Sequence, residues 1–192
     1  MNNALWSSLR EVLAPQSALL THSDHFVQQA AVMVLITDEP EPQLVFTLRA
    51  QHLNSHAGEV CFPGGRWELQ DATLLASALR ETHEEIGLPA AALEVLGALP
   101  VRATRLGTKV TPFVARIPAN YLFIPNPDEL DVVFTVPLKQ LLDNLLIRMD
   151  TFEFHNKKYR IPVYAYQGYE IWGFTAAVTA ELLVLLRPLV SF

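Results

Sequence analysis

Three glutamates in the segment RETHEEIGL, residues 80–88, are the side chains best placed to do chemistry. Glu81, Glu84 and Glu85 are spaced i, i+3 and i+4, so a helix would put their carboxylates on one face. Like charges at this spacing destabilise an isolated helix by about 0.2–0.5 kcal/mol per pair. No Lys or Arg follows any of the three by four residues. Because a divalent cation would cancel the repulsion, the cluster predicts a metal site.

A glycine turn precedes this segment in CFPGG, residues 61–65. Pro63 favours a turn, and the two glycines let the backbone bend tightly and approach a ligand closely. A main-chain carbonyl exposed there would add a hard oxygen ligand to the carboxylates. Mg²⁺ prefers such donors and commonly bridges protein carboxylates to substrate phosphates. The two features together indicate metal-assisted attack of water on a phosphate or diphosphate.

The element that must position the glutamates is a helix expected over residues 72–86. Leu75, Leu79, Thr82 and Ile86 form a stripe roughly opposite the three carboxylates, so the apolar side can pack while the acidic side faces a cleft. Gly87 and Pro89 would end this helix.

The remaining pattern indicates strands mixed with a few helices, and hence sheets packed against helices. An amphipathic helix is expected over residues 3–13, with Leu5, Leu9, Val12 and Leu13 on its apolar side. Continuous or alternating β-branched and aromatic segments predict strands, and two further apolar segments predict helices. The expected strands are residues 29–38, 43–50, 93–99, 109–117, 131–138, 151–161 and 164–174, and the expected helices are 138–142 and 176–186.

Composition restricts the classes of protein that fit. The chain has 192 residues, 51% of them hydrophobic, and no linker or repeat, which indicates one globular domain. The net charge of −6 argues against general affinity for nucleic acid. A single cysteine, Cys61, excludes an internal disulfide and favours a reducing, cytoplasmic location, as does an N-terminal segment unlike a signal peptide. We expect no membrane span.

Residues 64–88, GGRWELQDATLLASALRETHEEIGL, resemble the Nudix box, G-x5-E-x7-R-E-U-x-E-E-x-G-U, of hydrolases that act on nucleoside diphosphates linked to another moiety. Its second half matches, with Thr82 at the hydrophobic U position. In the first half Asp71 stands where the family usually has Glu, and the spacing from Gly65 to Arg80 is one residue longer than the general pattern.

The same longer spacing occurs in the Nudix subfamily that cleaves coenzyme A, whose upstream signature is L-L-T-x-R-[SA]-x3-R-x3-G-x3-F-P-G-G. Residues 45–65, VFTLRAQHLNSHAGEVCFPGG, are similar to it, except that Asn54 replaces the second arginine. The resemblance covers about residues 30–180. It implies an α/β/α sandwich with a mixed sheet and a glycine loop leading into the catalytic helix. The chain would be a single domain over 1–192, with a helix and lead-in over 1–28 and the Nudix core over 29–187.

The resemblance also implies roles for individual residues. Metal ions, Mg²⁺ or Mn²⁺, would be held by Glu81, Glu84, Glu85 and the carbonyl of Gly64. Arg80 would orient Glu81 through a charge-assisted pair, and Glu129 is the expected downstream acid, with Asp128 as the second choice. The implied reaction splits coenzyme A into adenosine 3′,5′-bisphosphate and 4′-phosphopantetheine. The substrate-binding candidates are Arg49, Asn54, Arg102 and Arg105. Independently of the resemblance, the charges of Arg49, Arg102, Arg105 and Lys109 would suit a basic rim that receives the 3′-phosphate and the diphosphate, with solvated surface as the equal alternative for each of them.

Two alternatives stay open at this stage. Asn54 removes a permanent cation, which leaves room for ADP-ribose, a dinucleotide or another nucleoside diphosphate derivative as substrate. A Nudix module that binds a nucleotide without cleaving it ranks last, because all three helix glutamates are kept. A homodimer is left open, and Cys61 is expected to be a small buried residue instead of a nucleophile, since no base is placed beside it.

Overall fold

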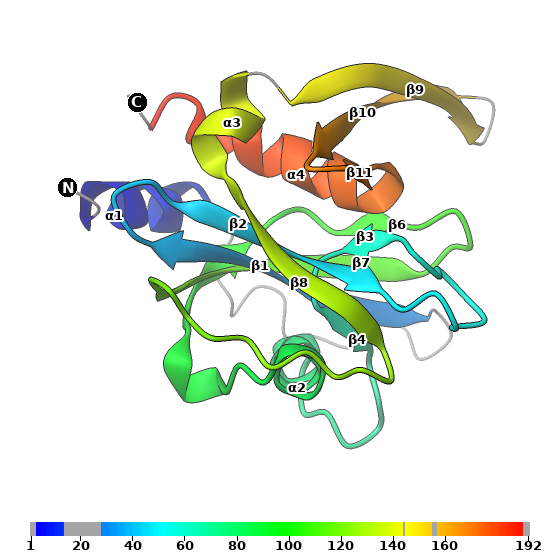
Figure 1. The fold of residues 1–192 in the computed structure, drawn as a ribbon, viewed down its shortest axis with the longest axis horizontal. Helices are drawn as coiled ribbons and strands as arrows, with labels where there is room; N and C mark the ends of the chain where they lie inside the picture. The colour runs from blue at the N-terminus through cyan, green and yellow to red at the C-terminus, as the bar shows by residue number, and fades with distance from the viewer. Residues whose placement is uncertain (1–2, 14–27, 144, 155–156, 190–192) are drawn as a thin grey trace.

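In the computed structural model of the chain, residues 3–13, 28–143, 145–154 and 157–189 are described. They form an eight-stranded mixed sheet and a separate three-stranded sheet, with helices on both sides of the larger one (Figure 1). In chain order the elements are α1 (Asn3–Val12), β1 (Gln29–Asp38), β2 (Gln43–Arg49), β3 (Val60–Cys61), β4 (Gly64–Arg66), α2 (Leu74–Ile86), a 3₁₀ helix (Ala90–Ala92), β5 (Glu94–Ala98), β6 (Arg102–Ala103), β7 (Lys109–Pro118), β8 (Leu130–Pro137), α3 (Leu138–Asp143), β9 (Leu146–Phe154), β10 (Lys157–Tyr166), β11 (Tyr169–Ile171) and α4 (Gly173–Leu186).

Strand β1 is the centre of the larger sheet. It runs parallel to β7 from the Gln29–Lys109 pair to the Asp38–Pro118 pair. On its other side it changes partner along its length, because β4 pairs with its first half and β2 with its second half. Parallel strands need a long crossover, and here the connection from β1 to β7 contains α2. The glycine turn and the acidic helix are therefore placed beside the same strand.

The two faces of the larger sheet bury different clusters. On one face α2 packs over β1, with Met33, Leu35 and Phe113 fully buried beneath it. On the other face α1, α4 and the three-stranded sheet cover a core that includes Phe46, Leu138 and Leu182 (Figure 1). This arrangement confirms the α/β sandwich with a mixed sheet that the sequence predicted.

The boundaries expected for the strands at 151–161 and 164–174 are wrong. The first segment falls across the hairpin of β9 and β10, and the second contains the end of β10, all of β11 and the start of α4. Gln167 and Gly168 both have positive φ, 50° and 90°, as a two-residue hairpin turn requires. An unbroken aromatic pattern hid this turn, and α4 accordingly begins at Gly173 instead of residue 176.

The N-terminal helix is confirmed, but its apolar face differs from the expected one. Leu5, Leu9 and Leu13 are buried, whereas Val12 is 48% exposed. The buried aromatic ring of Trp6 takes part in the packing, and its indole N–H donates to Asp38 at 2.9 Å. Among the helices of the described residues, none combines the length and the apolar character needed to cross a membrane.

Candidate active site

Local sequence signals define the ends of α2. Thr73 caps its N-terminus, since its hydroxyl accepts from the N–H of Ala76 at 3.0 Å. Gly87 follows its last residue in the left-handed conformation and donates its N–H to the carbonyl of His83. The helix thus begins at Leu74, two residues later than the sequence suggested.

The buried stripe of α2 is rotated slightly from the expected one. Leu74, Ala78, Thr82 and Ile86 are buried, whereas Leu75 and Leu79 are only partly buried. This rotation also buries Glu85.

The glycine turn fits between α2 and β1 only because it lacks side chains. A Cβ on Gly64 would lie 2.3 Å from the carbonyl oxygen of Ala31, and the φ of Gly64 is +148°. A Cβ on Gly65 would lie 2.3 Å from Oε1 of Glu81. These distances are far below van der Waals contact, so the turn brings the main chain directly against both the strand and the acidic helix.

Glu85 is the most buried of the three glutamates, with 3% of its side chain exposed. Its Oε2 accepts the N–H of Gly64 at 2.9 Å, and its Oε1 lies 3.6 Å from Nη1 of Arg49. The pKa of Glu85 is raised to about 8, mainly by burial; the negative charges of Glu81 and Glu129 contribute to the rise, while the N–H of Gly64 and the charge of Arg49 oppose it. With no cation present, this carboxyl is therefore largely protonated at pH 7.

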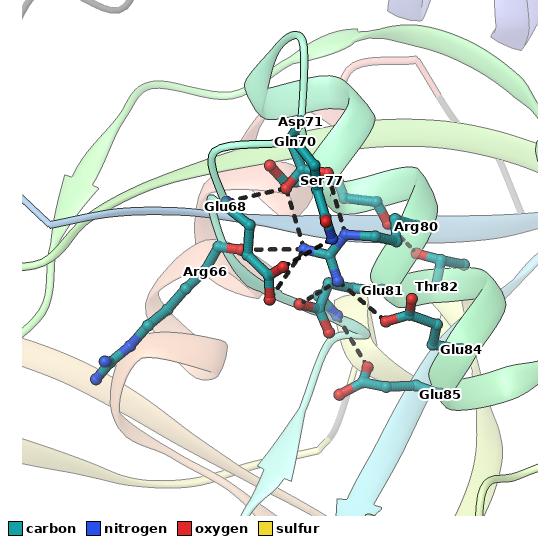
Figure 2. Close-up of polar contacts among 12 residues, drawn as sticks. Arg66, Glu68, Gln70, Asp71, Ser77, Arg80, Glu81, Thr82, Glu84 and Glu85 are labelled. Atoms are coloured by element: carbon teal, nitrogen blue, oxygen red, sulfur yellow. Dashed lines mark hydrogen bonds and ion pairs between the residues drawn. The ribbon is translucent and has the colours of Figure 1, made fainter.

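Arg80 lies at the centre of the cluster (Figure 2). Its Nε and Nη2 donate to the two carboxylate oxygens of Asp71, each at 3.0 Å, in a bidentate pair. Its Nη1 donates to Glu81 at 2.9 Å and to Glu84 at 3.0 Å. The repulsion among the glutamates is thus relieved by the arginine four residues before Glu84, a contact that a search for cations after each glutamate does not find.

Asp71 is a site residue whose contact the sequence did not specify. The bond from Arg80 is the main reason that the pKa of Asp71 falls to about 2. Asp71 also accepts the N–H of Glu68 at 3.0 Å, which closes the loop between the glycine turn and α2. The signal was available, because Asp71 occupies the position at which the Nudix box has its first glutamate.

Burial also raises the pKa of Glu81, and the negative charges of Glu84 and Glu129 contribute, while Arg80 lowers it. Glu129 is brought near by the loop after β7. Ile124 and Asn126 donate their N–H groups to the carbonyls of Ile86 and Glu85, at 3.0 and 2.8 Å, at the C-terminus of α2. This attachment carries Glu129 to the acidic face.

The predicted basic rim is not gathered in one place. Arg49 is the member beside the glutamates, and its Nε is buried without a hydrogen-bond partner within the described part of the chain. Arg102 instead donates to Glu181 of α4 at 2.8 Å, and α4 covers the face of the sheet opposite α2. Asn54 is exposed in the loop between β2 and β3, and Arg105 is exposed in the turn before β7.

The residues of the cluster are chemically suited to a hard divalent cation. Glu81, Glu84 and Glu85 supply carboxylate oxygens, and the turn at Gly64 and Gly65 leaves space that any Cβ would fill. In the described residues no three Asp, Glu, His or Cys side chains are grouped as a ready-made metal site. Cation binding would therefore compete with Arg80 for Glu81 and Glu84.

Cys61 lies close to this cluster but is not activated. Burial is the main cause that raises the pKa of its thiol to about 12, while the positive charge of Arg49 acts in the opposite direction. A thiol that stays protonated at neutral pH is a poor nucleophile.

Solved structures resemble this fold. A Nudix hydrolase from M. smegmatis, RenU, superimposes with a TM-score of 0.57 at 19% identity, covering 85% of this chain and 88% of that one. The Ap4A hydrolase of C. elegans, in a binary complex, gives a TM-score of 0.53 at 15% identity, covering 84% and 93%. At this identity the likeness concerns the fold alone.

Sequence comparison supplies the family. Proteins called uncharacterized Nudix hydrolase NudL in Salmonella paratyphi B and Salmonella newport are each 40% identical over 174 residues, covering 90% of this chain and 88% of theirs. The NUDIX domain profile matches residues 27–156. Given this match and the acidic helix seated on its glycine turn, the chain belongs to the NUDIX domain family and is a Nudix hydrolase.

Proposed function

We propose that this Nudix hydrolase cleaves the diphosphate linkage of coenzyme A or its thioesters, giving adenosine 3′,5′-bisphosphate and 4′-phosphopantetheine from the free coenzyme. The observation that carries the proposal is the contact between the two motifs. Arg49, from the segment similar to the coenzyme A signature, lies 3.6 Å from Glu85 of the Nudix box. A substrate phosphate held over Glu85 would thus be within reach of the positive charge of Arg49.

Glu81, Glu84, Glu85 and the carbonyl of Gly64 would hold Mg²⁺ or Mn²⁺ at this site. A bound divalent cation neutralises charge on the diphosphate and lowers the pKa of an attacking water. In the reaction a water oxygen bonds to one phosphorus, and the bond from that phosphorus to the bridging oxygen breaks. We assign Glu129 as the base that takes the proton of the water, since its charge acts on both Glu81 and Glu85.

Arg80 is proposed as a positioning residue. Its bidentate bond to Asp71 fixes the guanidinium, and its Nη1 then holds Glu81 on the side of the glycine turn. Arg49 is proposed to bind the anionic part of the substrate, because its buried Nε has a hydrogen still to donate. Such a donor gains a partner when a phosphate oxygen enters.

A second substrate class follows from Asn54. The side chain is neutral and exposed, so this loop has one positively charged side chain fewer than the coenzyme A signature. ADP-ribose or another nucleoside diphosphate derivative lacks the 3′-phosphate and would not need that positive charge. The two substrate classes are therefore separated by the 3′-phosphate.

The test is a product analysis by mass spectrometry with Mg²⁺ or Mn²⁺ and four substrates: coenzyme A, 3′-dephospho-coenzyme A, ADP-ribose and diadenosine tetraphosphate. We expect coenzyme A to be cleaved with the highest kcat/KM. Faster cleavage of ADP-ribose would refute the coenzyme A assignment. Glu84→Gln is the control, because this half-exposed side chain can lose its charge without a large effect on folding.

Two arginine variants test the role of Arg49. Arg49→Ala should raise KM for coenzyme A by about tenfold, the equivalent of one charge-assisted hydrogen bond. Arg102→Ala is the matched control, since its guanidinium is bound to Glu181, and its KM should stay unchanged. Equal effects of the two variants would show that Arg49 has no special part in substrate binding and would return Arg102 to the candidate set.

A further inference from the structure

The three-stranded sheet ends in an open edge. Its strand order is β11-β10-β9, and no strand in the described part of the chain pairs with the outer side of β9. Strand β9 is nine residues long, contains neither Pro nor Lys, and has Leu146 and Ile147 54% and 51% exposed. A long edge strand is a template for another strand, and the charged residues on β9, which include Arg148 and Asp150, restrict which strand it can accept. In Figure 1 β9 runs along the outside of the molecule.

The hydrogen-bond pattern identifies which backbone groups face this edge. Ala165 donates its N–H to the carbonyl of Leu145 at 3.0 Å, so β10 directs the N–H of residue 165 toward β9. Backbone direction alternates along a strand, which turns residue 162 away from β9. This agrees with its identity, Pro162, which has no N–H to donate. Met149 pairs with Pro162, so the N–H and C=O of Met149 point outward, and those of Thr151 do the same.

We propose that two copies of this chain associate through β9, antiparallel, about a two-fold axis at Met149. In this register the two Met149 residues exchange backbone hydrogen bonds. Arg148 of each copy then lies opposite Asp150 of the second copy, in a non-hydrogen-bonded pair where side chains approach most closely.

Charge selects this register over its neighbours. Moving the axis by one residue toward the C-terminus would set Met149 against Thr151 and Asp150 against Asp150 of the second copy. Moving it by the same amount toward the N-terminus would set Arg148 against Arg148. Like charges directly opposite are destabilising, whereas the axis at Met149 makes two opposite-charge pairs.

The charges set the register more than the affinity. Arg148 already donates to Asp150 at 3.0 Å and to Glu170 at 2.9 Å within its own chain, and all three side chains are exposed. Exposed ion pairs contribute little free energy. The association would come from the backbone bonds and from covering Leu146, Ile147 and Met149, which predicts a dimer that depends on concentration.

The first test is sedimentation velocity of the full chain from about 2 to 200 μM, a range that brackets dissociation constants of roughly 10 μM. Met149→Pro removes the outward N–H and no bond within the sheet, so it should raise the dimer dissociation constant by about tenfold or more. Met149→Ala keeps this N–H and is the matched control. A wild-type monomer at every concentration, or a dimer unaffected by Met149→Pro, would overturn the proposal.

The second test measures the register and does not depend on whether the proline variant folds. Met149→Cys would place two sulfurs on residues about 5.5 Å apart, within the range for a disulfide. Thr151→Cys would leave its residues about 14 Å apart along the strands. We expect covalent dimers under mild oxidation from Met149→Cys and not from Thr151→Cys, with the wild-type chain controlling for Cys61. Equal cross-linking of the two variants would refute this register.

Discussion

Neutralising Glu85 should stabilise the protein when no metal is present. Burial raises the pKa of Glu85 from 4.5 to about 8. The folded state therefore keeps this proton while the unfolded chain releases it, and the contribution to stability is complete below pH 4.5 and is lost as the pH rises toward 8. Glu85→Gln removes the titration, and its amide oxygen can still accept the N–H of Gly64.

The size of the effect follows from the two pKa values. At pH 7 the wild type has lost about 3 kcal/mol relative to its acid form, and at pH 5 about 1 kcal/mol. A chain of this size changes its Tm by about 2–4 °C per kcal/mol. In EDTA, Glu85→Gln should thus melt about 6–12 °C above the wild type at pH 7 and about 2–4 °C above it at pH 5.

The assay is thermal unfolding followed by circular dichroism between pH 5 and 8.5, with Glu84→Gln as the control because Glu84 is half exposed. The control should show no such dependence on pH. If the advantage of Glu85→Gln were the same at pH 5 and pH 8, or absent, the buried environment of this carboxyl would not control its titration and the reasoning would fail.

Three further predictions concern the same cluster. Arg80→Ala leaves the buried charge of Asp71 unpaired, so urea unfolding should show a loss of about 3 kcal/mol, and Arg80→Ala combined with Asp71→Ala should lose less than the single variant. Gly65→Ala puts a Cβ 2.3 Å from the Glu81 carboxylate, a flexible group that can move aside. Its kcat should therefore fall about 100-fold while its Tm changes little. Mg²⁺ should raise the Tm of the wild type more at pH 8 than at pH 6, because the cation binds the ionised form of the carboxylates, and differential scanning fluorimetry would measure this.

The sequence predicted the parts of the site that depend on local spacing. A helix puts residues i, i+3 and i+4 together wherever it lies, so the common face of Glu81, Glu84 and Glu85 needed no tertiary information. Gly64 and Gly65 were likewise visible as a place of close backbone approach. The structure adds the reason for each glycine, which is the backbone of β1 for one and the Glu81 carboxylate for the other.

Contacts between distant segments could not be predicted from the sequence. Nothing in the sequence distinguishes Arg49 from Arg102 and Arg105. In the structure, the pairing of β2 with β3 places Arg49 beside Glu85. Arg102 lies on β6, from which its side chain reaches Glu181 on α4. Side-chain direction on short strands depends on register, and register is set by pairing that one sequence does not display.

The position of Asp71 would let Arg80 keep its place both with and without a bound cation. Because Asp71 holds Nε and Nη2 of Arg80, the guanidinium would stay fixed if a cation took Glu81 and Glu84 from Nη1. The arginine would then lose two hydrogen bonds and keep its bidentate pair, so no buried charge would be left without a partner. The spacing from Gly65 to Asp71 is that of the Nudix box, so the extra residue lies between Asp71 and Arg80. The spacing among Arg80, Glu81, Glu84 and Glu85 is also that of the box, so the acidic face of α2 is unaffected by the extra residue.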